Sequence, residues 1–94
     1  SMGMLLGYIE GNSFHVSLDN ETIADENILY FDEQGKVQKG RLDSPANGGA
    51  FLMANLKPGL HTLVIRSSDG QVVNSRLVVS EAGVLNTVSG ELTP

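Results

Sequence analysis

The strongest constraint on the fold of this 94-residue chain is a two-residue period in its apolar side chains. Phe14, Val16 and Leu18 are separated by polar residues, and Leu63 and Ile65 lie in a similar segment. Successive side chains of a β-strand point to opposite faces, so this period predicts strands with one buried face. Further strands are expected at residues 5–9, 28–31 and 50–54, around Leu77 and Val79, and over residues 84–92.

Short turn signals separate the expected strands. Residues 32–35 and 67–70 both end in glycine, which readily adopts the positive φ that a hairpin turn needs. The other expected connections are a tight turn at Pro58-Gly59, a longer loop at 44–49, a link at 81–83, and a loop or at most one helical turn at 20–29. Several short strands separated by such turns indicate a β-sandwich or a β-barrel.

Length and composition point to one small domain. Residues 5–94 are expected to form a single β-sandwich domain, and residues 1–4 are interpreted as a cloning remnant or linker. We interpret the domain as a fragment of a larger protein. The absence of cysteine from the sequence excludes disulfides, thiolate metal sites and cysteine nucleophiles.

The charge distribution restricts the partners of the chain. A net charge of −5 argues against binding to nucleic acid or to an anionic membrane, because both need clustered Lys and Arg side chains. Seven acidic and no basic residues precede Lys36, whereas six basic and four acidic residues follow from Lys36 onward, a net charge of +2. We therefore expect an acidic and a mildly basic flank, which together with a free sheet edge favour a weak contact with a neighbouring domain and weak self-association of the fragment. The alternative is that the charge asymmetry is incidental and the domain is an inert spacer.

No catalytic, cofactor-binding or metal-binding residue is predicted. His15 and His61 are the only histidines, and neither has a second His or Cys at the spacing of metal ligands. No serine lies in the Gly-x-Ser-x-Gly pattern of a nucleophile. The chain is therefore expected not to be an enzyme, and no cofactor is expected.

Two charged clusters leave alternatives open. The acidic residues Asp19, Glu21, Asp25 and Glu26 lack the spacing of a calcium loop, so a solvated loop is favoured and calcium binding is kept as the alternative. The basic residues near residues 36–41 either face an acidic partner or simply cover an exposed strand. These basic residues are Lys36, Lys39 and Arg41.

The segment at residues 49–65 carries a family resemblance. Its sequence, Gly49-Ala50-Phe51-Leu52-Met53-Ala54-Asn55-Leu56-Lys57-Pro58-Gly59 followed by Leu60-His61-Thr62-Leu63-Val64-Ile65, resembles that of carboxypeptidase-regulatory-like, or transthyretin-like, domains. Residues 7–11 and 28–32 are similar to the first two strands of those domains. The chain departs from the family at His61, where a tyrosine is usual, and at residues 12–27, which are longer and more acidic. The small sandwich domains of outer-membrane pilus ushers are also similar.

The resemblance implies a fold and a class of function. It implies an all-β fold, a small immunoglobulin-like or prealbumin-like antiparallel β-sandwich of about seven strands. It also implies a non-catalytic structural or protein-interaction module of a bacterial cell-envelope or secreted protein, in an extracytoplasmic location. The expected partners are neighbouring domains of the same chain or another protein, with no nucleic acid and no membrane insertion.

The alternative is a small carbohydrate- or calcium-binding accessory module of an enzyme or adhesin. The sequence has no Trp and only two Tyr residues. Sugar-binding sites usually stack aromatic rings on the sugar, so this composition favours the interaction module. Exposure of Tyr8, Tyr30 and Phe31 on one face would favour the alternative. The residues predicted to form the core are Phe51, Leu56, Leu63, Ile65 and Leu77.

Overall fold

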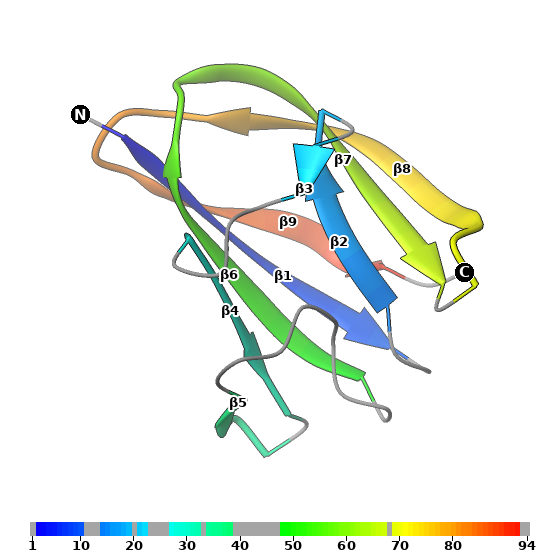
Figure 1. Ribbon diagram of the computed structural model, residues 1–94. Helices are drawn as coiled ribbons and strands as arrows, with labels where there is room; N and C mark the ends of the chain where they lie inside the picture. Colours follow the sequence, from blue (N-terminus) through cyan, green and yellow to red (C-terminus); the bar gives the residue numbers. More distant parts are fainter. Residues whose placement is uncertain are drawn as a thin grey trace.

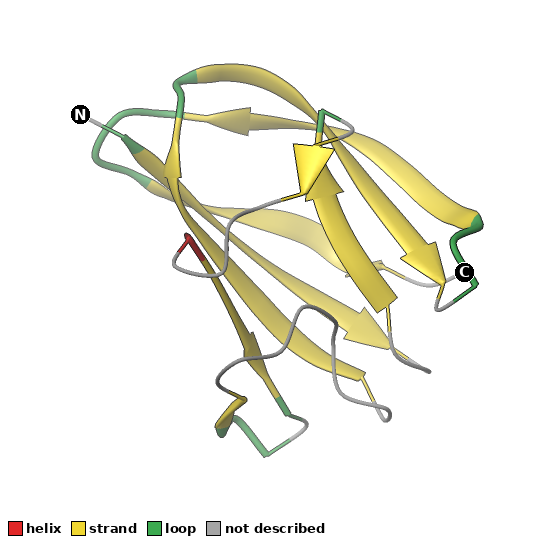
Figure 2. Ribbon diagram, viewed as in Figure 1, coloured by secondary structure: helices red, strands yellow, loops and turns green. Residues whose placement is uncertain are grey.

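Two β-sheets pack face to face in the computed structural model of the chain (Figures 1 and 2). The structure describes residues 2–10, 14–19, 21–22, 27–32, 34–38, 48–67 and 69–92. The strands within these residues are β1 (Gly3–Glu10), β2 (Phe14–Leu18), β3 (Glu21–Thr22), β4 (Ile28–Phe31), β5 (Val37–Gln38), β6 (Gly48–Leu56), β7 (Gly59–Ser67), β8 (Val72–Ser80) and β9 (Leu85–Leu92). The all-β sandwich is thus confirmed, with seven strands of four residues or more.

The strand order places β8 and β9 at two sheet edges. One sheet has the order β5-β4-β6-β1-β9 and the other the order β3-β2-β7-β8. The pairs between described strands are antiparallel except for β1 with β9, which are parallel. The first strand begins at Gly3, two residues before the expected start of the domain, and Met4 pairs with Leu85. No helix within the described residues is long and apolar enough to cross a bilayer.

The turn signals fall into two groups. Gly35 and Gly70 have φ of +81° and +89°, and each closes a hairpin within one sheet, as expected. The turns at residues 57–59 and 81–83 instead carry the chain from one sheet to the other. The segment at 20–29 contains the short strand β3, which the sequence does not predict, and its residues 23–26 lie outside the described part. Most of the expected loop at 44–49 also lies outside it, and Gly48 and Gly49 begin β6.

The core lies between the inner faces of the two sheets. Phe51, Leu56, Leu63 and Ile65 are buried, as predicted. The prediction for Leu77 is wrong: its side chain is 66% exposed. Leu77 lies in a run of three apolar residues, where alternation does not define the inner face, and Val78 is the residue of that run that faces the core.

Two local features show how the sequence shapes the five-stranded sheet. Gly7 of β1 pairs with Phe51 of β6. The Phe51 ring lies so close to Gly7 that a Cβ atom added to Gly7 would be 2.4 Å from ring atom Cζ. Asn55 has φ of +59° and donates its side-chain amide to the Asn27 side-chain oxygen at 2.7 Å. Asparagine tolerates this left-handed backbone better than most residues, so β6 changes direction at Asn55 before the buried Leu56.

Candidate functional site

The structure brings His61 of β7 together with Asp19 at the end of β2. The Nδ1 atom of His61 lies 2.6 Å from Asp19 Oδ2, and Nε2 lies 2.6 Å from the backbone oxygen of Lys57. The second carboxylate oxygen of Asp19 accepts a bond from the Thr62 backbone N–H at 2.8 Å, and the Asp19 N–H donates to the Thr62 carbonyl. This network links the end of β2 to the turn between β6 and β7.

The hydrogen-bond partners determine the charge of the imidazole. A carboxylate oxygen and a carbonyl oxygen can only accept, so His61 satisfies both when both ring nitrogens carry a proton. Accordingly the hydrogen bond to Asp19, and then the bond to Lys57, raise the pKa of His61 above 6.5. The bonds from His61 and Thr62 lower the pKa of Asp19 below 3.8. We call this pair the latch, because it connects the end of β2 to β7 and to the turn before β7. Its hydrogen bonds and its ionic attraction are strongest when the imidazole is protonated.

The latch makes stability depend on pH. A histidine whose pKa is raised by folding stabilises the fold fully below its unfolded pKa, and this contribution is lost as the pH rises through the folded pKa. Asp19, with a lowered pKa, contributes above its unfolded pKa. Between 3.8 and 6.5 both contributions are therefore present, and above pH 6.5 the His61 contribution is expected to decline. Urea denaturation of the unsubstituted chain, called the parent below, at a series of pH values measures this decline.

The matched variants for this prediction are His61→Gln, which removes the titrating group, and Asp19→Asn, which keeps a residue that tolerates the φ of +55° at this position. Both variants are expected to lose most of the decline above pH 6.5. An unchanged decline in His61→Gln would assign it to other groups.

Of the other acidic residues of the calcium alternative, Glu21 is exposed, and Asp25 and Glu26 lie outside the described residues. Within the described residues no three His, Cys, Asp or Glu side chains are grouped as metal ligands are. Of the basic cluster, Lys36 is exposed beside β5, and Lys39 and Arg41 lie outside the described part.

The three aromatic residues of the carbohydrate alternative are not exposed together, because Tyr30 is buried. Tyr30 is 1% exposed, and its hydroxyl accepts a hydrogen bond from the backbone N–H of Val16 across the core. Tyr8 is 51% exposed and Phe31 is partly buried. Tyr30 is therefore not available for stacking on a sugar ring, whereas Tyr8 and Phe31 lie on the outer face of the five-stranded sheet.

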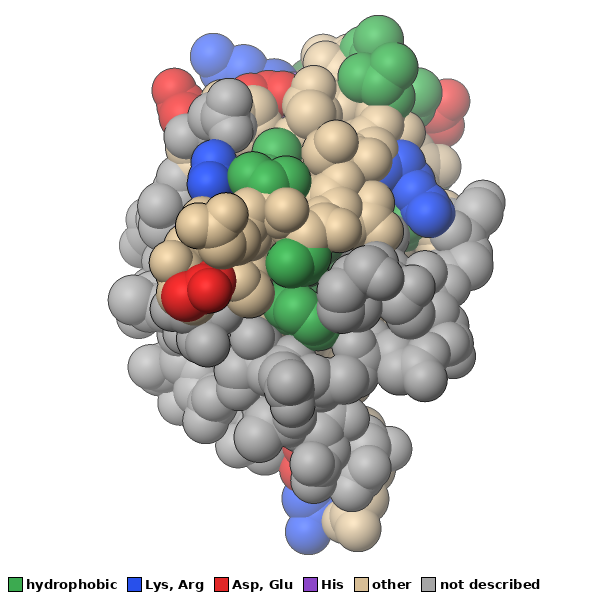
Figure 3. Space-filling view, turned by 90° about the vertical axis from the view of Figure 1, so that its right-hand side faces the viewer, with side chains coloured by type: hydrophobic (Ala, Val, Ile, Leu, Met, Phe, Trp, Pro, Cys, Tyr) green, Lys and Arg blue, Asp and Glu red, His purple; other side chains and the backbone are tan. Residues whose placement is uncertain are grey.

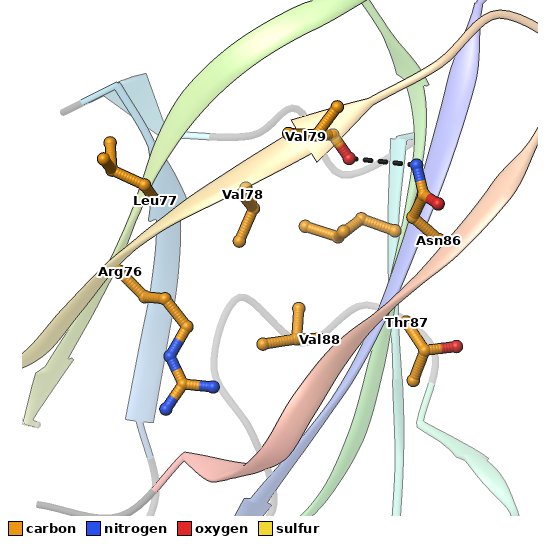
Figure 4. Close-up of a pocket in the computed structure, with 8 residues that line it drawn as sticks. Arg76, Leu77, Val78, Val79, Asn86, Thr87 and Val88 are labelled. Atoms are coloured by element: carbon orange, nitrogen blue, oxygen red, sulfur yellow. Dashed lines mark hydrogen bonds between the residues drawn. The ribbon is translucent and has the colours of Figure 1, made fainter.

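A groove lies between the edge strands β8 and β9. It has a volume of about 250 Å³ and is lined by residues 76–79 of β8, residues 86–88 of β9 and Leu5 of β1. Val78 and Val88 point into it from the two sides (Figure 4). Leu5, Val78 and Val88 are all at most 8% exposed, so the floor of the groove is part of the hydrophobic core.

The backbone of β8 also faces the groove. The side-chain amide of Asn86 donates to the Val79 carbonyl at 3.0 Å, so this carbonyl points away from β7 and toward β9. In antiparallel strands every second residue directs its N–H and C=O to the same side. The N–H and C=O of Leu77 therefore also point away from β7. The molecule thus offers a strand edge beside an apolar floor.

The chemistry of the groove is that of a binding surface. Its lining residues are Leu, Val, Asn, Thr and Arg, and they include no acid, histidine, serine or cysteine. The volume is below the roughly 300–1,000 Å³ of typical small-molecule pockets. On the side of the molecule that faces the viewer in Figure 3, small apolar patches lie among polar and charged side chains.

The sequence does not predict this groove. The prediction that Leu77 is a core residue implies the opposite orientation of β8. If Leu77 pointed inward, Val78 would point away from the groove. The unbroken apolar run at residues 77–79 leaves the inward face of β8 undecided, because either Val78 or its two neighbours could face the core. Which strands lie at sheet edges depends on long-range pairing, which the local pattern does not contain.

Comparison with protein-family models, with curated proteins and with solved structures found no match for the chain.

Proposed function

We propose that this chain is a non-catalytic protein-interaction module that binds an extended segment of a partner protein along β8, over the groove between β8 and β9. The observation that carries the proposal is the combination of a strand edge with a core-lined apolar floor. In strand addition, backbone hydrogen bonds to the edge supply affinity, and pockets for alternate side chains supply specificity. Val78 and Val88 form such a pocket beside the edge groups of Leu77.

The setting proposed for the module is a bacterial cell-envelope or secreted protein. The similarity of residues 49–65 to carboxypeptidase-regulatory-like domains supports this setting, as does the similarity of the strand and turn pattern to usher domains. The partner is then a neighbouring domain of the same chain or a second envelope protein. The fixed, apolar and uncharged floor of the groove supports an interaction module over a carbohydrate- or calcium-binding one.

The test separates backbone pairing from side-chain contact. Leu77→Pro removes the N–H that faces the groove and leaves the bonds to β7 in place, because proline is tolerated where the N–H of an edge strand points outward. Leu77→Ala is the matched control, since it shortens the same side chain and keeps the N–H. The probe is a library of displayed peptides selected against the parent chain.

The selected peptides are expected to have apolar residues at every second position. They should bind the parent and Leu77→Ala and bind Leu77→Pro at least about tenfold more weakly. A second variant, Val78→Phe, fills the groove from within and should also weaken peptide binding. It keeps the proposal testable if Leu77→Pro does not fold. Equal binding to Leu77→Pro and Val78→Phe in folded form would refute strand addition at this edge.

A further inference from the structure

The described side chains on the outer face of the five-stranded sheet are almost all apolar. Alternation along each strand turns Leu5, Phe51 and Tyr30 into the core and their neighbours outward. Cross-strand pairing joins these outward side chains into continuous rows. The outward side chains are Met4, Leu6 and Tyr8 of β1, Leu29 and Phe31 of β4, Val37 of β5, Ala50, Leu52 and Ala54 of β6, and Leu85 and Thr87 of β9.

The register shows how these rows run. Leu29 of β4 pairs with Leu52 of β6, which pairs with Leu6 of β1. A second row joins Phe31 and Tyr8 through the small Ala50. None of the side chains described on this face is charged. Leu29 is 40% and Tyr8 51% exposed, so this face presents apolar surface to solvent.

The outer face of the four-stranded sheet is different. There the outward cross-strand pairs contain polar groups, as in His15 with Arg66 and Thr62 with Leu77. A sheet face in contact with water usually shows such alternation, whereas strands apolar at successive positions are typical of sheets covered on both faces. The runs at residues 4–9, 28–31 and 50–54 belong to the second kind. The second sheet covers one face of these strands, and no described element covers the other (Figure 1).

We propose that a second copy of this chain covers the outer face of the five-stranded sheet, forming a two-fold symmetric dimer. A symmetric contact places the same patch on both copies, so the apolar rows that run through Leu29, Leu52 and Leu6 in one copy would meet the same rows of the other. Two sheets pack well face to face at about 10 Å. The dimer would be a four-layered stack whose inner layers are the two five-stranded sheets.

The area of the face fits a weak dimer. Neighbouring strands lie about 4.8 Å apart, and each residue extends a strand by about 3.3 Å. Three of the strands β4, β6, β1 and β9 are eight or nine residues long and β4 has four residues, so the four strands have a flat area of roughly 390 Å². Two copies therefore bury roughly 800 Å² before the relief of the side chains is added, somewhat below the ~1,000 Å² at which specific interfaces begin, which fits a weak dimer.

Sedimentation equilibrium of the whole chain tests the dimer. The chain is expected to associate between about 10 μM and 1 mM. Leu29→Lys places a charge within the contact and should weaken association at least about tenfold. Leu60→Lys is the matched control, because Leu60 is 65% exposed and lies on the other sheet, in β7. Tyr8→Lys repeats the test from β1 if Leu29→Lys is poorly folded.

The salt dependence and the groove variant Leu77→Pro identify which surface of the chain forms the dimer. Association through an apolar face should persist from about 50 mM to about 500 mM salt, whereas a contact between acidic and basic flanks should fade. Leu77→Pro should leave the dimer intact, which separates this face from the peptide groove. A chain that stays monomeric to about 1 mM, that dissociates with rising salt, or that responds to Leu60→Lys rather than to Leu29→Lys would overturn the proposal.

Discussion

Replacing Leu63 by alanine is expected to lower the free energy of unfolding by about 2–5 kcal/mol. Leu63 is 0% exposed, and its side chain extends from β7 into the core between the two sheets. The variant loses the transfer free energy of the removed groups, and it leaves a cavity that the neighbouring strands close only in part. Chemical denaturation followed by circular dichroism measures the change.

Leu77→Ala is the control for this prediction. It removes the same groups from a side chain that is 66% exposed and belongs to β8, the neighbour of β7. Substitutions at such positions usually change stability by no more than about 0.5 kcal/mol. Equal losses in the two variants would mean that the inner and outer faces of β7 and β8 are assigned wrongly.

The comparison of these two leucines shows what the sequence pattern determines. Where polar residues separate the apolar ones, as at Phe14, Val16 and Leu18, alternation identifies the inner face correctly. Where apolar residues are adjacent, as at residues 77–79, two registers satisfy the pattern equally and only the pairing with β7 selects between them. The turn glycines were predictable because positive φ is a local property, whereas the sheet that each turn leads to is not.

The candidate sites also differ in whether a local sequence pattern predicts them or they depend on long-range strand pairing. His61 and Asp19 are 42 residues apart, so the latch depends on the pairing of β2 with β7 and has no local signal. The groove depends on which strands lie at the edges of the sheets. The apolar outer face of the five-stranded sheet, in contrast, is present in the sequence as runs of consecutive apolar residues, and it becomes a surface once the register aligns Leu29, Leu52 and Leu6.

Gly7→Ala is expected to destabilise the chain by about 1–3 kcal/mol, although alanine is normally the better residue in a strand. The reason is the ring of Phe51, which is 0% exposed and has atoms 2.4 and 2.5 Å from the position of the added Cβ. The ring fills the space that Gly7 leaves and is itself held by the core. It can move away from the new methyl group only by displacing its neighbours.

A double-mutant cycle with Phe51→Leu tests this cause directly. Phe51→Leu alone should destabilise the parent, because it leaves part of the ring's volume empty. In the Gly7→Ala background the same change removes the overlap, so it should cost less than in the parent, and the two effects should fall short of additivity by more than about 0.5 kcal/mol. Leu63→Ala combined with Gly7→Ala is the control, since Leu63 lies in the opposite sheet and is not among the atoms nearest the added Cβ. Additive losses in the Gly7 and Phe51 cycle would show that the glycine is needed for its backbone and not for the ring that lies over it.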